Sequence, residues 1–248
     1  MTNISRLPLV VLLCAAVVAC QTDGDEQLDV AETSPVPGVA ENAEREGNHE
    51  AAARQYLAAF ERNTADAANL IAGARNLRYA GRAGDGLKIM TRFYPDFVEN
   101  ADFRFELGKT RIAAGKSEGA VEDLEFVTAA SPDNWEAFSA LGIAHDMTES
   151  FGDAQAAYRT AMTLSDSDPT VLNNYAISLA LSGDVEGAIV LLKDQPRAIR
   201  RSAHIRQNLA MFLAIQGDME TAGELARMDL DQDQVDRNLQ FFQEFNDD

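Results

Sequence analysis

The sequence predicts an all-α protein built as a solenoid of repeated helical hairpins, and three regularities support this prediction. Small residues recur every 34 positions, at Ala52, Gly86, Ala120, Ala154, Ala188 and Ala222. A large and a small residue stand together twelve or thirteen positions before the last four, at Leu107-Gly108, Leu141-Gly142, Tyr175-Ala176 and Leu209-Ala210. A glycine that suits a helix end recurs at Gly47, Gly81, Gly115, Gly183 and Gly217, with Glu149 as the exception. A fixed period of this length indicates a stack of like units.

The packing pattern within each unit identifies the kind of repeat. Four residues after the last four of the recurring small residues stand Leu124, Tyr158, Leu192 and Ala226. This order, large–small and then small–x3–large, resembles the tetratricopeptide repeat (TPR). The resemblance implies a TPR α-solenoid of about five to six helix–turn–helix repeats over residues 40–230. The pattern is regular over 101–230 and weaker in the first two repeats, where glycine occupies two packing positions and the first helix is short.

The last repeat of such a stack needs a cap with a polar outer side, because each hairpin buries its apolar face only against a neighbour. Residues 231–248 suit a capping helix and tail. Apolar residues recur there at helical spacing among charged and amide residues, at Val235, Leu239, Phe242 and Phe245.

The first 19 residues have the layout of a secretory signal: Arg6 precedes an apolar run from Leu7 to Ala19. The run is shorter than the roughly 20 residues that a membrane-spanning helix needs. The sequence Val17-Val18-Ala19-Cys20 resembles a bacterial lipobox, which implies a lipid on Cys20. Two alternatives stay open: ordinary cleavage that leaves Cys20 as a free thiol, and an uncleaved anchor. Gln21, in place of aspartate, implies sorting to the outer membrane, facing the periplasm.

Residues 20–39 are acidic, contain prolines and glycines, and show no sustained apolar period, so we expect a flexible tether. Loss of residues 1–19 would remove Cys14 and leave one cysteine, which excludes a disulfide within the chain and a cysteine metal cluster. The remaining 40 acidic and 20 basic side chains give a formal charge of −20, which disfavours nucleic acid and anionic lipid headgroups as partners.

The sequence shows no motif that is typical of an active site. His49, His145 and His204 fall at unrelated repeat positions, and neither a phosphate-binding loop nor a nucleophile elbow is present. We therefore expect no enzyme activity, metal, cofactor or small-molecule substrate.

The inner groove of a TPR array is lined by the first helix of each repeat, chiefly at the second, fifth, sixth, ninth, twelfth and thirteenth positions. In the last three repeats these positions include amides and flexible apolar residues, which could bind an extended peptide. The candidate residues are Ile143, Met147, Asn173, Asn174, Ile177, Leu181, Gln207, Asn208, Met211 and Ile215. The alternative is that some of these residues, above all Ile177 and Met211, only pack helices together. Grooves that clamp acidic tails carry several bases, whereas the aligned repeats carry only Lys109, at the ninth position, so that activity is not expected.

A closer resemblance covers about the last 150 residues. The stretches Val171–Leu192 and Ile205–Leu230, with the preceding run DAQAAYRTAM, resemble the TadD lipoproteins of tight-adherence (Flp) pilus assembly. This resemblance implies a lipid-anchored, non-enzymatic assembly factor that helps the outer-membrane secretin of the pilus, or another component, to localise or oligomerise. The alternative is a general periplasmic scaffold for outer-membrane protein assembly or envelope maintenance.

Overall fold

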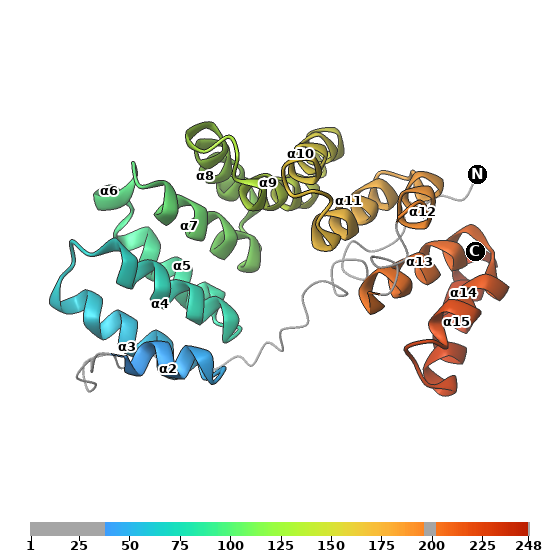
Figure 1. Cartoon of the computed structure of the whole chain (residues 1–248), viewed down its shortest axis with the longest axis horizontal. Helices are drawn as coiled ribbons and strands as arrows, with labels where there is room; N and C mark the ends of the chain where they lie inside the picture. The colour runs from blue at the N-terminus through green and yellow to red at the C-terminus, as the bar shows by residue number, and fades with distance from the viewer. Residues whose placement is uncertain (1–37, 196–201, 248) are drawn as a thin grey trace. The chain divides into compact units, whose positions relative to one another are not determined.

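A computed structural model describes residues 38–195 and 202–247, and all the helices named below lie in these ranges (Figure 1). The predicted signal, Cys20 and the tether up to residue 37 lie outside the described residues. The described part divides into two compact units, residues 38–133 and 134–247, called here the N-terminal and the C-terminal unit. None of the helices in the described ranges is long and apolar enough to cross a membrane.

The N-terminal unit consists of three helical hairpins and one short extra helix. Its helices are α2 (Val39–Arg45), α3 (His49–Arg62), α4 (Ala67–Tyr79), α5 (Ala83–Arg92), α6 (Tyr94–Phe97), α7 (Ala101–Ala113) and α8 (Ser117–Ala130). The hairpins are α2/α3, α4/α5 and α7/α8, and α4 packs against both α3 and α7.

The C-terminal unit consists of three further hairpins and a final helix. Its helices are α9 (Trp135–Met147), α10 (Phe151–Leu164), α11 (Pro169–Leu181), α12 (Val185–Lys193), α13 (Ala203–Gln216), α14 (Met219–Ala226) and α15 (Gln232–Asp247). In the hairpins α9/α10, α11/α12 and α13/α14, the first helices α9, α11 and α13 pack against one another in order. Helix α15 packs on α13 and α14, as the predicted cap should.

The 34-residue period appears directly in the helix boundaries. The second helices of the hairpins begin at residues 49, 83, 117, 151, 185 and 219, and the first helices, from α4 on, begin at 67, 101, 135, 169 and 203. The predicted all-α repeat fold is therefore confirmed, including the two repeats whose sequence pattern is weak.

One turn conformation joins the two helices of every hairpin. The predicted glycines all have left-handed backbone, from φ 69° at Gly115 to φ 98° at Gly217. Glu149 adopts the same conformation with φ 58°, although a side chain makes it costly. The turn around it keeps the helix-ending hydrogen bond of the others, since the Ser150 N–H donates to the His145 carbonyl at 2.9 Å, as that of Asn48 does to Ala43 at 2.8 Å. The repeat therefore imposes the turn even where its residue is unfavourable.

The pairing of small and large residues is the packing device that the sequence predicted. A Cβ atom on Gly108 would lie 2.8 Å from Leu124 Cγ, and one on Gly142 would lie 2.6 Å from Tyr158 Cε1. Glycine therefore lets the large side chain of the second helix lie directly on the first helix. Removing this contact space would force the two helices apart.

Helix α6 has no counterpart in the other repeats and was not predicted. Phe93, Tyr94 and Phe97 lie in or beside it and pack against the N-terminal core, where the Phe60 and Phe93 rings meet edge to face at 4.8 Å between centroids. The segment between α5 and α7 is thus part of an aromatic cluster, which adds apolar contact to the repeats with the weakest sequence pattern.

Candidate protein-binding groove

The ten candidate groove residues lie on three neighbouring first helices of the C-terminal unit, α9, α11 and α13. Eight of them are partly exposed, so their side chains remain accessible to a partner: Ile143, Met147, Asn173, Asn174, Ile177, Leu181, Gln207 and Met211. Asn208 and Ile215 are buried, with 8% and 7% exposure.

Asn208 corrects one expectation about this groove. Asn174 and Asn208 share a repeat position, and both are candidate residues for binding a peptide. Instead the Asn208 side-chain amide donates a hydrogen bond of 2.7 Å to Asn173 Oδ1 and thereby joins α13 to α11. Asn174 remains half-exposed and makes no side-chain hydrogen bond within the described residues. A partner can therefore reach Asn174, whereas Asn208 holds two helices together.

The apolar candidates divide their surface between the core and the groove. Ile177, Leu181 and Met211 all pack against the core cluster of α11–α14, and each keeps part of its side chain exposed. Each of these residues therefore both packs helices together and contributes to the exposed surface. Their exposed parts leave apolar surface on α11 and α13 that a partner could contact.

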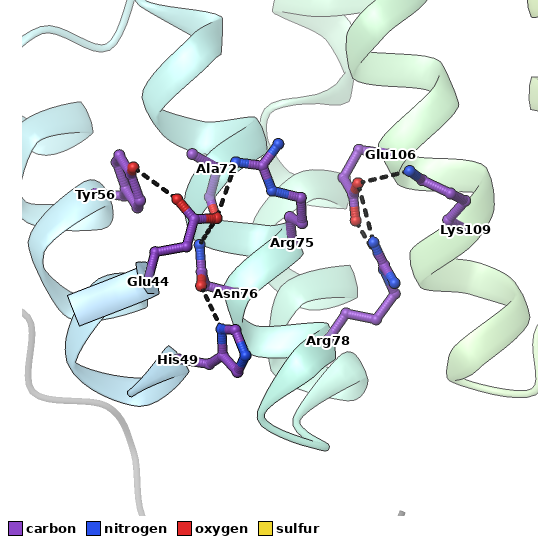
Figure 2. Close-up of polar contacts among 9 residues, drawn as sticks. All are labelled: Glu44, His49, Tyr56, Ala72, Arg75, Asn76, Arg78, Glu106 and Lys109. Carbon is purple, nitrogen blue, oxygen red and sulfur yellow. Dashed lines mark hydrogen bonds and ion pairs between the residues drawn. The ribbon is translucent and has the colours of Figure 1, made fainter. Parts of the chain in front are cut away.

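The same repeat positions in the N-terminal unit carry charges that are paired with one another (Figure 2). Glu106 on α7 lies between two cations, accepting from Arg78 Nε at 2.9 Å and lying 3.4 Å from Lys109 Nζ. Its side chain is only 3% exposed, against 16% for Arg78 and 28% for Lys109. Burial tends to lower the pKa of Arg78, but the hydrogen bond that Arg78 donates to Glu106 and the charge of Glu106 raise this pKa overall.

A second polar network joins the first three helices of the N-terminal unit (Figure 2). The Glu44 carboxylate on α2 accepts from Tyr56 at 3.0 Å, and from Arg75 and Asn76 at 3.1 Å each. His49 Nδ1 lies 2.9 Å from Asn76 Oδ1, so the buried Asn76 bridges α2, α3 and α4. Burial tends to raise the pKa of Glu44, but these hydrogen bonds and the Arg75 charge lower it overall. Burial and the Glu44 hydrogen bond raise the pKa of Tyr56 to about 12.

Sequence reasoning missed these charged positions of the N-terminal unit, because the groove positions were compared only in the more regular repeats. Arg75 lies 34 residues before Lys109 and therefore also occupies the ninth position. Extending the register by one repeat would have identified it. The bases do not form an open clamp, because Glu44 and Glu106 already bind Arg75, Arg78 and Lys109.

A buried carboxyl group marks the C-terminal unit. Asp146 on α9 is 7% exposed and accepts from Ser178 Oγ at 2.6 Å and from Tyr158 OH at 2.9 Å. Burial raises the pKa of Asp146 to about 6, although both hydrogen bonds act in the opposite direction. No cation pairs with Asp146 among the described residues. Asp146 therefore connects α9, α10 and α11. The free-energy cost of burying its carboxyl group depends on whether that group is protonated.

In the described ranges, no group of three or more His, Cys, Asp or Glu side chains is arranged to hold a metal ion.

Comparisons with known proteins agree with this architecture. A family model described as tetratricopeptide repeat matches residues 105–169. No curated protein sequence matches the chain. Among solved structures, the chain is similar to TTC0263, a thermophilic TPR protein of Thermus thermophilus, with 18% identity, a TM-score of 0.57, and coverage of 72% of this chain and 97% of that one. It is also similar to MamA of Desulfovibrio magneticus RS-1, with 18% identity, a TM-score of 0.56, and coverage of 63% and 88%. At such identities the likeness shows the fold, and this chain has the fold of a TPR α-solenoid.

Proposed function

We propose that this protein is a non-enzymatic, lipid-anchored scaffold on the periplasmic face of the outer membrane, which binds a protein partner and assists assembly of an Flp pilus. The partner that we propose is the outer-membrane secretin of the pilus machine. The observation that carries the binding role is the partly exposed row of amide and apolar side chains on α9, α11 and α13. TPR arrays are typically protein-interaction scaffolds.

The chemistry of this row suits a peptide backbone. The amides of Asn174 and Gln207 offer donors and acceptors, and neither makes a side-chain hydrogen bond within the described residues. Met147 and Met211 are flexible apolar side chains that adapt to different partner shapes. A partner would thus gain hydrogen bonds and apolar contact without displacing an existing ion pair.

The pilus role and the membrane location rest on sequence. The lipobox-like Val17-Val18-Ala19-Cys20 and the TadD-like stretches Val171–Leu192 and Ile205–Leu230 support them. A lipid on Cys20 would hold the groove near the membrane in which a secretin assembles. Tethering raises the effective concentration of a weakly binding site, in favourable cases by several orders of magnitude.

The proposal is tested with the secretin encoded in the same pilus gene cluster. We expect the full chain, purified in detergent from envelopes, to retain that secretin, and a deletion strain to contain fewer secretin multimers on native gels of outer membranes. Cys20→Ser should lose palmitate labelling and reduce the multimers to the level of the deletion strain.

Two outcomes would count against this function. Normal secretin multimers in the deletion strain would contradict the pilus role. If other outer-membrane proteins were lost instead, the general periplasmic scaffold would be the better description.

A further inference from the structure

A pocket of about 210 Å³ lies at the end of the C-terminal unit, between α13, α14 and the capping helix α15. It is partly open to solvent and mainly apolar. Its lining residues are Gln207, Ala210, Met211, Ala214, Ala222, Ala226, Leu230, Val235, Asn238, Leu239 and Phe242. Gln207 and Met211 are also groove residues, so the pocket continues the candidate groove.

The pocket exists because one repeat lacks a large side chain. Four residues after the recurring small residue, the preceding repeats place Met90, Leu124, Tyr158 and Leu192, and each of these is at most 1% exposed. In the last repeat the same position is Ala226. The side chain that lies on Gly108 or Gly142 in other hairpins therefore has no counterpart opposite Ala210.

Helix α15 covers this space only in part. Val235 is fully buried against Ala210 and Ala226, whereas Leu239 and Phe242 keep part of their surface exposed. An apolar cavity of about 150 Å³ can hold a benzene-sized group, and sites for drug-sized ligands are roughly 300 Å³ or larger. The volume thus suits a single large side chain better than a cofactor.

Charge indicates the kind of segment that would bring this side chain. Residues 134–248 contain 19 acidic and eight basic side chains. Residues 203–247, which contain α13, α14 and α15, have nine acidic and three basic side chains. Asp231 and Asp236 lie within one helical turn of the lining residue Val235 and are exposed, as are the two bases Arg227 and Arg237. Arg206 on α13 is already bound to Asp229. An acidic surface attracts a basic partner and repels an acidic one.

We propose that this pocket binds a phenylalanine- or leucine-sized side chain from a basic segment of a protein partner. The apolar side chain occupies the position that Leu124 or Tyr158 fills in the earlier repeats. The Gln207 and Asn238 amides face the segment at the pocket, and the surrounding carboxylates attract its lysines and arginines. This inference rests on the proposed function and names the chemistry of the partner.

The test measures fluorescence anisotropy of labelled nonapeptides with the full-length chain in detergent. The main probe has one central phenylalanine between serines and two lysines at each end. We expect an alanine-centred peptide to bind at least about tenfold more weakly, because a large buried apolar side chain contributes this much or more. A peptide with glutamates in place of the lysines should not bind, and added salt should weaken the main probe.

The variant Ala226→Leu supplies the side chain that the other repeats have. It should melt no lower than the parent and bind the main probe at least about tenfold more weakly. Ala156→Leu, which adds the same group at an exposed position of α10, is the matched control and should bind normally. If Ala226→Leu does not fold, Met211→Lys should repel the basic probe, whereas Met211→Glu should retain it.

Equal binding by folded Ala226→Leu and the parent would overturn the pocket assignment, as would equal binding of the glutamate peptide. Displacement of the probe by decanoate at low concentration would indicate an acyl-chain site and would also overturn it. Secretin capture by the parent chain is measured separately. Its failure would overturn the proposed function, whatever the peptides do.

Discussion

The two units use the same repeat for different surfaces. In the N-terminal unit, the groove-facing positions of α4 and α7 carry charges that bind one another through Glu44 and Glu106. In the C-terminal unit, the corresponding positions of α11 and α13 carry amides and apolar side chains. Residues 38–133 contain 16 acidic and 12 basic side chains, against 19 and eight in residues 134–248. The period thus determines the backbone, while the groove positions remain free to become a structural network or a binding surface.

The largest effect on stability is expected at Glu106, whose ion pairs distinguish the N-terminal unit from the C-terminal unit. Glu106→Gln should lower the free energy of unfolding by about 2–3 kcal/mol, because Arg78 and Lys109 lose the carboxylate that both contact. Loss of one partner from a fully buried pair costs roughly 3–5 kcal/mol, and these two cations keep some contact with water. Chemical denaturation measures the effect. Asp102→Asn, an exposed change on the same helix, is the control, and equal losses in both variants would contradict the role of the ion pairs.

Two carboxyl groups, Asp146 in the C-terminal unit and Glu44 in the N-terminal unit, should contribute pH dependences of opposite sign. The pKa of Asp146 rises from its ordinary 3.8 to about 6 in the folded protein, so the folded state keeps a proton that the unfolded state has already lost. The contribution of Asp146 to stability is therefore full below pH 3.8 and is lost as the pH rises to about 6, by up to about 3 kcal/mol. Asp146→Asn should remove this slope.

The matched variant in the N-terminal unit is Glu44→Gln. The lowered pKa of Glu44 means that its contribution is present above pH 4.5 and is lost as the pH falls. Denaturation curves of both variants and the parent between pH 3 and 8 supply the two slopes. Slopes of the same sign would refute the distinction between a buried unpaired carboxyl group and a paired one.

Two asparagines at one repeat position of the groove, Asn174 and Asn208, should differ in their contribution to stability. Asn208→Ala should destabilise the protein by about 1 kcal/mol, because it removes the buried hydrogen bond to Asn173. Asn174→Ala should leave the melting temperature nearly unchanged. Equal thermal shifts would show that the structural difference between the two amides has no energetic meaning.

The smallest effect is expected at the turn that lacks glycine. Glu149→Gly should stabilise the C-terminal unit by up to about 1 kcal/mol, because a residue with a Cβ pays roughly 1–2 kcal/mol in left-handed backbone and glycine loses part of that gain in the unfolded chain. Gly115→Ala is the reciprocal change in the N-terminal unit and should destabilise it. Thermal melts with the same sign of shift would contradict a common turn.

The fold was predictable because small residues, large residues and turn glycines all repeat at 34 positions and each has a packing reason. Helix α6 was not predictable in this way, because Tyr94 and Phe97 belong to an aromatic cluster that does not recur with the repeat. The burial of Asn208 depends on the amide of Asn173 on the neighbouring helix, which a single-repeat alignment does not compare. The sequence did align Ala226 with Leu124, Tyr158 and Leu192, but it did not show that α15 leaves the missing volume partly open.

The most direct test measures secretin capture by two variants, each of which changes two groove-position side chains in one of the two units. Asn174→Ala with Met147→Ala removes partly exposed side chains from the C-terminal groove. Arg75→Ala with Ile71→Ala removes partly exposed side chains at the ninth and fifth repeat positions of α4. With both variants folded, the account predicts that the first captures at least about tenfold less secretin, and that the second captures as much as the parent. Normal capture by the first variant, or loss only in the second, would contradict it.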